Sequence, residues 1–130
     1  MKISIVGLGF VGLSLTTVLA SKGNDVLGID VDKNKCENLK KAISPFYEPG
    51  LERLLKISLK KKLKISPDFS LIKNSDMIFV TVGTPQKTDG SIELSMIKNA
   101  VKNIGKVLRT NKKNPIIFIK STVTPGTMQK

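Results

Sequence analysis

Apolar residues along this chain fall alternately into short continuous runs and into sets spaced three or four residues apart. The short runs are rich in β-branched residues and predict strands at residues 2–6, 25–30, 63–66, 76–82 and 115–120. The helical spacing predicts helices at residues 11–22, 33–43, 49–62 and 94–109, with a helical turn at residues 67–73. Residues 121–130 have the composition of a loop.

This alternation of strands and helices predicts an α/β fold. We expect a Rossmann-type, doubly wound parallel sheet with helices on both faces. The apolar run at 76–82 is continuous, as in a strand buried on both faces. The 130 residues suit one domain. A doubly wound sheet usually continues with another helix and strand, so we expect residues 1–130 to be the front part of a longer enzyme, with the sheet incomplete at its C-terminal end.

Glycines in the spacing G-x-G-x-x-G lie between the first predicted strand and the first predicted helix. Gly7 permits a tight turn, Gly9 lets a pyrophosphate approach the backbone, and Gly12 lets the helix pack closely on the strand. Asp30 ends the second predicted strand, where a carboxylate accepts hydrogen bonds from the adenosine ribose. A carboxylate there repels a 2′-phosphate, so the pattern predicts NAD binding in preference to NADP. The positive charges of Lys33 and Lys35, just beyond Asp30, weaken this preference.

Two polar, proline-containing segments follow later strands. They are "VGTP" at residues 82–85 and "KSTVTPGT" at residues 120–127. Ligands of open α/β sheets bind outside the carboxyl ends of the strands. We therefore expect the hydroxyl and backbone N–H groups of these segments to line the cofactor site.

Composition excludes several kinds of site. The chain has no histidine and a single cysteine, Cys36, which excludes Ser-His-Asp triads, histidine-ligated zinc sites and an intrachain disulfide. We expect no metal, and we interpret Cys36 as a surface or half-buried helix residue without chemistry. No leader peptide or long apolar run is evident, so we expect a soluble, cytoplasmic protein that does not contact a membrane.

The charge of +12, from 22 basic and 10 acidic residues, raises the alternative of a nucleic-acid-binding module. The densest basic run is "LKKKLK" at residues 59–64. However, the lysines are spread over most predicted helices, and aromatic residues are few. We favour solvated helix faces, which attract anionic substrates at long range, and predict no nucleic-acid partner.

Five segments together resemble the N-terminal, NAD-binding domain of the UDP-glucose/GDP-mannose dehydrogenases. They are "GLGFVGL", "GIDVDKNK", "SPFYEPGLERLL", "VTVGTPQKTDGSIELS" and "KSTVTPGT", and they span nearly the whole chain. The "YEPGL" and "STV" elements are more specific than the glycine pattern. They argue against the alternative of another NAD(P)-dependent dehydrogenase on the same fold, such as a 6-phosphogluconate or 3-hydroxyacid type.

The resemblance implies a set of cofactor-binding residues. Those expected to hold the pyrophosphate are Gly7, Gly9, Phe10, Val11 and Gly12, and those expected at the ribose are Asp30 and Lys35. Near the cofactor the resemblance implies Gly83, Thr84 and Pro85, and near the nicotinamide Ser121 and Thr122. Thr122 is implied to help position water or the active-site network. Glu48 is implied to belong to a structural segment on the cofactor side.

The reaction implied by the resemblance is oxidation of the sugar C6 alcohol of a UDP-sugar, either UDP-glucose or a UDP-N-acetylhexosamine, to the uronic acid. It proceeds by two hydride transfers to NAD, with a covalent cysteine intermediate between them. The family's catalytic cysteine lies in later segments and does not match Cys36. We therefore expect residues 1–130 to bind NAD as an inactive monomer, and the whole enzyme to be a homodimer. Thr124 stands where the family has proline directly after valine.

Overall fold

All the strands of the described residues, 1–129, lie in one parallel sheet in the computed structural model. They are β1 (Lys2–Val6), β2 (Asp25–Ile29), β3 (Leu63–Ser66), β4 (Met77–Val80) and β5 (Ile116–Ile119). Their order is β3-β2-β1-β4-β5, and every neighbouring pair is parallel. The chain therefore adds β2 and β3 on one side of β1 and then crosses over to add β4 and β5 on the other side. This reversal of strand order opens a crevice at the carboxyl ends of β1 and β4.

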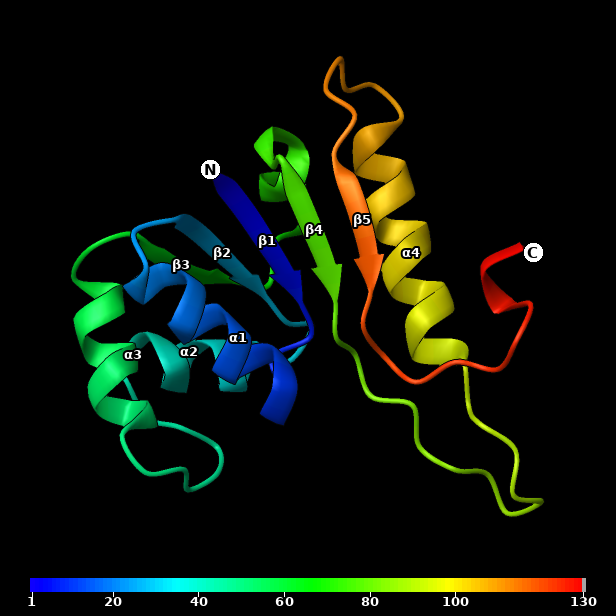
Figure 1. Ribbon diagram of the computed structural model, residues 1–130, viewed down its shortest axis with the longest axis horizontal. Helices are drawn as coiled ribbons and strands as arrows, with labels where there is room; N and C mark the ends of the chain where they lie inside the picture. Colours follow the sequence, from blue (N-terminus) through cyan, green and yellow to red (C-terminus); the bar gives the residue numbers. More distant parts are fainter. Residues whose placement is uncertain (130) are drawn as a thin grey trace.

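Helices cover both faces of the sheet, as the sequence predicts (Figure 1). One face carries α1 (Phe10–Ser21), α2 (Lys33–Lys40) and α3 (Leu51–Leu59). The other face carries the 3-10 helix η1 (Phe69–Asn74) and α4 (Ser95–Leu108). A further 3-10 turn, η2 (Thr127–Gln129), lies in the segment predicted as a loop. No helix within residues 1–129 is long and apolar enough to cross a membrane.

The core has two layers, one on each side of the sheet, and β1 supplies both. Ile3 and Ile5 pack into the layer under α1, α2 and α3, whereas Val6 packs into the layer under α4. Side chains of a strand alternate between faces, so a fully buried β1 has apolar residues on both sides. This burial holds the turn after β1 in a fixed position.

Several predicted element ends are wrong by a few residues. The helix predicted to reach residue 43 ends at Lys40, because Ala42 adopts a left-handed conformation with φ of 60°. The helix predicted from residue 49 begins at Leu51, after Gly50 with φ of 80°, and it ends at Leu59 instead of residue 62. The strand predicted at 76–82 shortens to β4, although the backbone N–H of Thr81 still donates to the carbonyl oxygen of Val6.

The edge strand β5 has apolar side chains that remain exposed. Ile116 is 59% exposed and Phe118 is 40% exposed, although the Phe118 ring stacks on Phe79 at 4.9 Å. In the register of β4 and β5, Phe118 pairs with Phe79, so both rings lie on the sheet face opposite α4. The sheet is therefore covered less completely at β5 than at β1.

Candidate cofactor site

A cavity of about 370 Å³ opens at the carboxyl ends of β1, β2 and β4. Five residues predicted from the sequence line it: Gly7, Gly9, Asp30, Lys35 and Gly83. The residues after β1 and β2 form one side, and α4 forms the other. The cavity therefore occupies the switch point at which open α/β sheets bind ligands.

The glycine turn at the cavity requires two of its glycines for steric reasons. Gly7 has φ of 99°, and a Cβ there would lie 2.7 Å from the backbone nitrogen of Val82. A Cβ on Gly12 would lie 1.8 Å from the carbonyl oxygen of Gly7. The turn is thus packed against the end of β4 on one side and against α1 on the other, with no room for a side chain.

Gly9 has a different environment from the other two glycines. A Cβ on Gly9 would meet no atom within 4 Å. Gly9 is the N-cap of α1 and has no side-chain cap. The first N–H groups of α1 therefore face open space, and such a helix start attracts an anion through its free donors and partial positive charge.

Asp30 is almost fully buried, with 8% exposure, and its carboxylate is held from three directions. Oδ2 accepts a hydrogen bond from the backbone N–H of Leu8 (2.8 Å), and Oδ1 accepts one from the N–H of Asp32 (2.9 Å). The ammonium group of Lys35 lies 3.1 Å from Oδ2. The side chain at the end of β2 thus fixes the glycine turn after β1, and the structure places Lys35 beside it as expected.

Thr81 supports the same turn and was not identified from the sequence. Its buried hydroxyl donates to the carbonyl oxygen of Gly7 at 2.7 Å and also lies 3.2 Å from that of Val6. The residue directly follows β4, so the hydroxyl ties the ends of the two central strands together. Nothing in the local sequence distinguishes this threonine from an ordinary strand residue.

Phe10 and Val11 begin α1 and do not line the cavity. Their side chains are 59% and 49% exposed, and the Phe10 ring lies 5.0 Å from that of Phe46. This contact joins the segment before α3 to the glycine turn. Glu48 lies in that segment and is exposed, lining a separate groove between α1 and α3.

The later predicted residues surround the site without lining the cavity. Thr84 and Pro85 follow Gly83 in the segment after β4. The Ser121 hydroxyl donates to the carbonyl oxygen of Val82 at 2.7 Å and so joins the segments after β4 and β5. Thr122 is exposed beside it. Their roles toward a cofactor stay predictions.

The cavity wall also includes residues that sequence reasoning missed. They combine apolar side chains with two amides and are Val31, Phe69, Met96, Asn99 and Asn103. Asn99 and Asn103 lie one turn apart on α4, on a helix whose polar face looks like an ordinary solvated surface in the sequence. Apolar walls with a few amides suit a flat, polar heterocycle.

Cys36 differs from expectation in its position. It is fully buried, and its thiol donates to the backbone carbonyl oxygen of Asp30 at 3.4 Å. Burial, and then the negative charge of Asp30, raise the pKa of this thiol. Cys36 faces the core because α2 packs on the sheet through Cys36 and Leu39. The lysine-rich sequence around Cys36 gave no indication of this burial.

These features fit a dinucleotide. The open space above Gly9 accommodates a pyrophosphate at the start of α1, and the Asp30 carboxylate stands where ribose hydroxyls would donate to it. The cavity between Val31 and α4 then suits the adenine ring. Each part is supplied by a different element, and the buried contacts around Gly7 hold the parts in register.

Comparisons with known proteins agree with this geometry. Residues 1–130 match the family model of the UDP-glucose/GDP-mannose dehydrogenase family, NAD binding domain. The GDP-mannose 6-dehydrogenase of Pseudomonas syringae pv. tomato is 41% identical over 130 residues, which are 98% of this chain and 30% of that protein. The chain therefore spans less than a third of the length of this relative.

Solved structures of similar proteins have the same fold. A GDP-mannose dehydrogenase from Pseudomonas aeruginosa, crystallised as a ternary complex, has a TM-score of 0.97 and 36% identity, covering 100% of this chain and 30% of that one. A UDP-glucose dehydrogenase from Pyrobaculum islandicum has a TM-score of 0.92 and 34% identity, covering 97% and 30% respectively. These proteins thus share the fold of nearly the whole chain.

Proposed function

Because the chain belongs to the UDP-glucose/GDP-mannose dehydrogenase family, we propose that it is the NAD-binding part of an enzyme that oxidises a nucleotide sugar at C6. NAD is the cofactor of this domain. The reaction we propose converts the primary alcohol to the carboxylic acid in two hydride transfers, for which bound NAD would supply the hydride acceptor. Hydrolysis of the resulting cysteine thioester by water would then supply the second oxygen and release the thiol. The observation that carries the proposal is the open start of α1 at Gly9, next to the fixed carboxylate of Asp30.

We assign the binding of NAD to residues by their surroundings. The backbone N–H groups at Gly9, Phe10 and Val11 would hold the pyrophosphate, since no side chain covers them. Gly7 and Gly12 would shape the turn. Asp30 would accept hydrogen bonds from the adenosine ribose and repel a 2′-phosphate, while Lys35 orients the carboxylate.

The nicotinamide end of the site would lie near the segments after β4 and β5. Gly83 borders the cavity, and Ser121 joins the two segments through Val82. We propose that Thr84 and Pro85 pack beside the cofactor and that Thr122, the exposed neighbour of Ser121, helps to position water for the hydrolytic step. Thr122→Ala would then reduce turnover of the complete enzyme more than it weakens NAD binding.

The proposed substrate is a nucleoside diphosphate sugar. The relatives described above are named for GDP-mannose and for UDP-glucose. We propose a UDP-sugar and keep GDP-mannose as the alternative. The buried Cys36 is unsuited to be the nucleophile of the covalent step, so that step would use a cysteine outside residues 1–130. We further propose that the complete enzyme is a homodimer and works in the cytoplasm, where NAD is available.

Calorimetric titration with NAD and NADP tests the cofactor site directly. We expect saturable NAD binding, weaker NADP binding, and loss of NAD binding in Asp30→Ala. The matched control is Asp25→Ala, which removes an exposed carboxylate at the opposite end of β2. Equal affinity of the wild-type protein and Asp30→Ala for NAD would contradict the assignment. Formation of NADH with GDP-mannose, UDP-glucose or a UDP-N-acetylhexosamine as substrate then identifies the sugar.

A further inference from the structure

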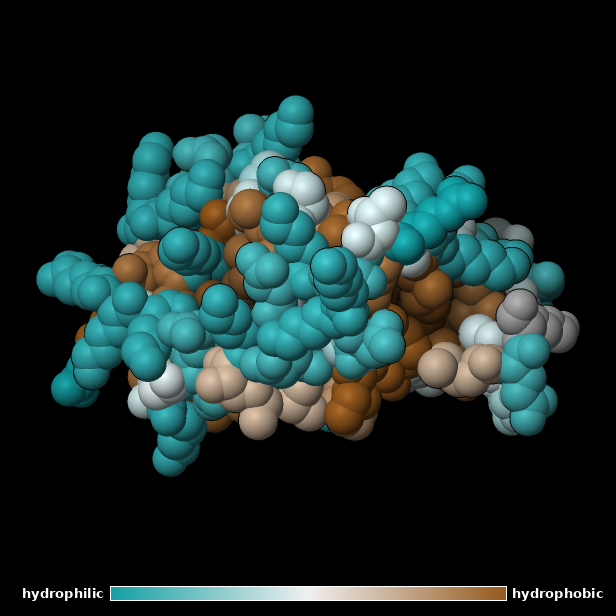
Figure 2. Space-filling view, turned by 90° about the horizontal axis from the view of Figure 1, so that it is seen from above, coloured by the Kyte–Doolittle hydropathy of each residue, from teal (hydrophilic) through white to brown (hydrophobic). Residues whose placement is uncertain are grey.

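Basic residues gather at the amino-terminal ends of the strands, opposite the cofactor cavity. We call this end of the sheet the basic edge. All strands start at this edge and α1, α3 and α4 end there, because the sheet is parallel and its helices run antiparallel to it. Lysines at these starts and ends include Lys2, Lys22, residues 60–62, Lys64, Lys112 and Lys113. Figure 2 views the molecule from this side and shows long hydrophilic side chains over most of the face.

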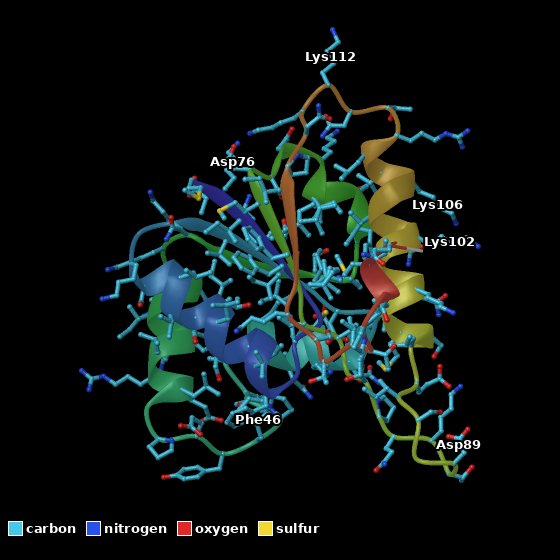
Figure 3. The ribbon with its side chains drawn as sticks, turned by 45° about the vertical axis from the view of Figure 1, so that its right-hand side comes forward. Phe46, Asp76, Asp89, Lys102, Lys106 and Lys112 are labelled. Atoms are coloured by element: carbon cyan, nitrogen blue, oxygen red, sulfur yellow. The ribbon has the colours of Figure 1, made fainter. Side chains whose placement is uncertain are left out.

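The acidic residues are distributed differently. Among residues 1–129, Asp25 and Asp76 are the acidic residues at this edge, and each has a lysine partner. Lys62 lies 4.0 Å from Asp25, and Lys113 lies 2.6 Å from Asp76. By contrast, Asp30 directly follows β2, and Asp89 lies in the segment after β4. In Figure 3, Asp76 and Lys112 lie at one end of the molecule and Asp89 at the other.

The helix dipole explains part of this distribution. A lysine in the last turn of a helix complements the partial negative charge there. However, the helix ends and the acidic residues do not account for all of these lysines. Lys62 and Lys113 donate to the carbonyl oxygens of Gly23, after α1, and of Asn74, at the end of η1. Lys61, Lys64 and Lys112 add further positive charge beyond the ends of α3 and α4.

Apolar side chains lie among these lysines. A groove of about 580 Å³ at this edge is lined by Lys2, Lys61 and Lys64 together with Leu71. Leu71 is 48% exposed, and Met1, next to Lys2, is 67% exposed. Aromatic side chains, on which nucleic-acid bases stack, are absent from the lining of this groove within residues 1–129. Lysine ammonium groups with exposed aliphatic side chains suit the headgroup region of an anionic membrane.

We propose that this basic edge docks reversibly on the surface of an anionic phospholipid membrane. The proposal departs from the expectation of no membrane contact, which rested on the lack of a long apolar run and so concerned membrane-spanning segments only. The lysines contact the lipid phosphates, and Met1 and Leu71 enter the headgroup region. The cofactor cavity, at the opposite end of the strands, then faces the solution and stays accessible to NAD and substrate. The inference does not depend on the proposed reaction, because the lysines that carry it lie outside the cofactor cavity.

Sedimentation with lipid vesicles tests the proposal. The protein is mixed at low salt with vesicles of phosphatidylglycerol and phosphatidylcholine in equal parts, or of phosphatidylcholine alone. The test variant combines Lys60→Gln, Lys61→Gln and Lys64→Gln. The control variant combines Lys33→Gln, Lys98→Gln and Lys120→Gln, which removes the same charge from exposed positions at or near the carboxyl ends of the strands.

We expect binding to the anionic vesicles alone, weakened by moderate salt. Each lysine near an anionic leaflet raises the partition coefficient roughly fivefold, so the test variant should bind at least about tenfold more weakly and the control variant about as well as wild type. Equal loss in both variants would show that net charge, not this edge, drives binding. Absence of vesicle binding would also overturn the proposal. Binding of the protein to duplex DNA, measured in parallel, without binding to vesicles would favour a nucleic-acid-binding surface.

Discussion

The backbone N–H of Leu8 donates a hydrogen bond to the carboxylate of Asp30, with 2.8 Å between Leu8 N and Asp30 Oδ2. Both residues are buried, and they lie at the ends of the adjacent strands β1 and β2. The acid at the end of β2 therefore has a structural task in addition to its proposed contact with ribose. It holds the turn that faces the cofactor.

Replacing Asp30 should lower stability as well as NAD affinity. Asp30→Ala leaves the N–H groups of Leu8 and Asp32 without their acceptor, which we expect to cost about 1–3 kcal/mol of unfolding free energy. Asp30→Asn keeps one carbonyl oxygen and should cost less. Urea denaturation measures both. Asp25→Ala, an exposed control, should change stability by less than about 0.5 kcal/mol, and an equal loss in Asp25→Ala and Asp30→Ala would contradict the structural role.

Alanine substitutions in the glycine turn should separate folding from binding. Gly9→Ala should fold normally, because its φ of −76° suits any residue and its Cβ meets nothing within 4 Å. It should nevertheless weaken NAD binding at least about tenfold, since the methyl group occupies the approach of the pyrophosphate.

Gly12→Ala should instead impair folding. Its Cβ would overlap the carbonyl oxygen of Gly7, so we expect a loss of about 3 kcal/mol or failure to fold. Gly105→Ala is the control in α4, where the Cβ has open space, and it should stabilise by about 0.5–1 kcal/mol. Thermal unfolding and calorimetry measure the two effects, and unchanged NAD affinity in Gly9→Ala would refute the pyrophosphate assignment.

Asp76 should make stability depend on acidity. A hydrogen bond from Lys113, followed by one from the backbone N–H of Lys2, holds the pKa of Asp76 below its ordinary value of 3.8. The ionised Asp76 carboxylate therefore stabilises the folded state above pH 3.8. This stabilisation is lost as the pH falls through the lower pKa that Asp76 has in the folded state.

The variant Asp76→Asn tests this linkage. Its deficit in unfolding free energy relative to wild type should be largest near neutral pH and should shrink below pH 3.8. Lys113→Gln removes the larger cause and should reproduce most of the effect. A deficit that stays constant across this range would show that the carboxylate's charge contributes nothing.

The Cys36 thiol should be unreactive in the native protein. Burial and the charge of Asp30 raise its pKa above the ordinary 9.0, and the reactive species is the thiolate. Ellman's reagent should therefore label it only through unfolding, with full reaction in denaturant. Because the unfolded thiol ionises first, stability should also fall as the pH rises above 9.0. Native labelling as fast as in denaturant would contradict the burial.

The parts of the site that were predicted from the sequence are those whose signal is local. Gly7, Gly9 and Gly12 follow one strand directly, and Asp30 ends the next, so spacing alone indicated them. Thr81 escaped because its acceptor, the carbonyl oxygen of Gly7, is 74 residues away. Asn99 and Asn103 escaped because amides on the polar face of an amphipathic helix are ordinary.

The same limit applies to the fold. The strands could be identified from their apolar runs, but the end of α2 depends on Ala42, a non-glycine residue with positive φ, which a sequence pattern does not reveal. The burial of Cys36 depends on how α2 packs on the sheet and not on its lysine-rich neighbours.

The central position of β1 has a consequence for the order of folding. β1 is the first strand along the chain, yet one of its two partners, β4, begins only at Met77. The turn after β1 cannot reach its final conformation until residues 81 and 82 have been synthesised and β4 has paired with β1. Thr81 donates a hydrogen bond to Gly7, and the backbone of Val82 packs against Gly7. Closing so long a loop slows folding, and in a parallel sheet it comes late. The ability to bind NAD should therefore arise with the closure of the sheet and not before, so cofactor affinity reports completion of the fold.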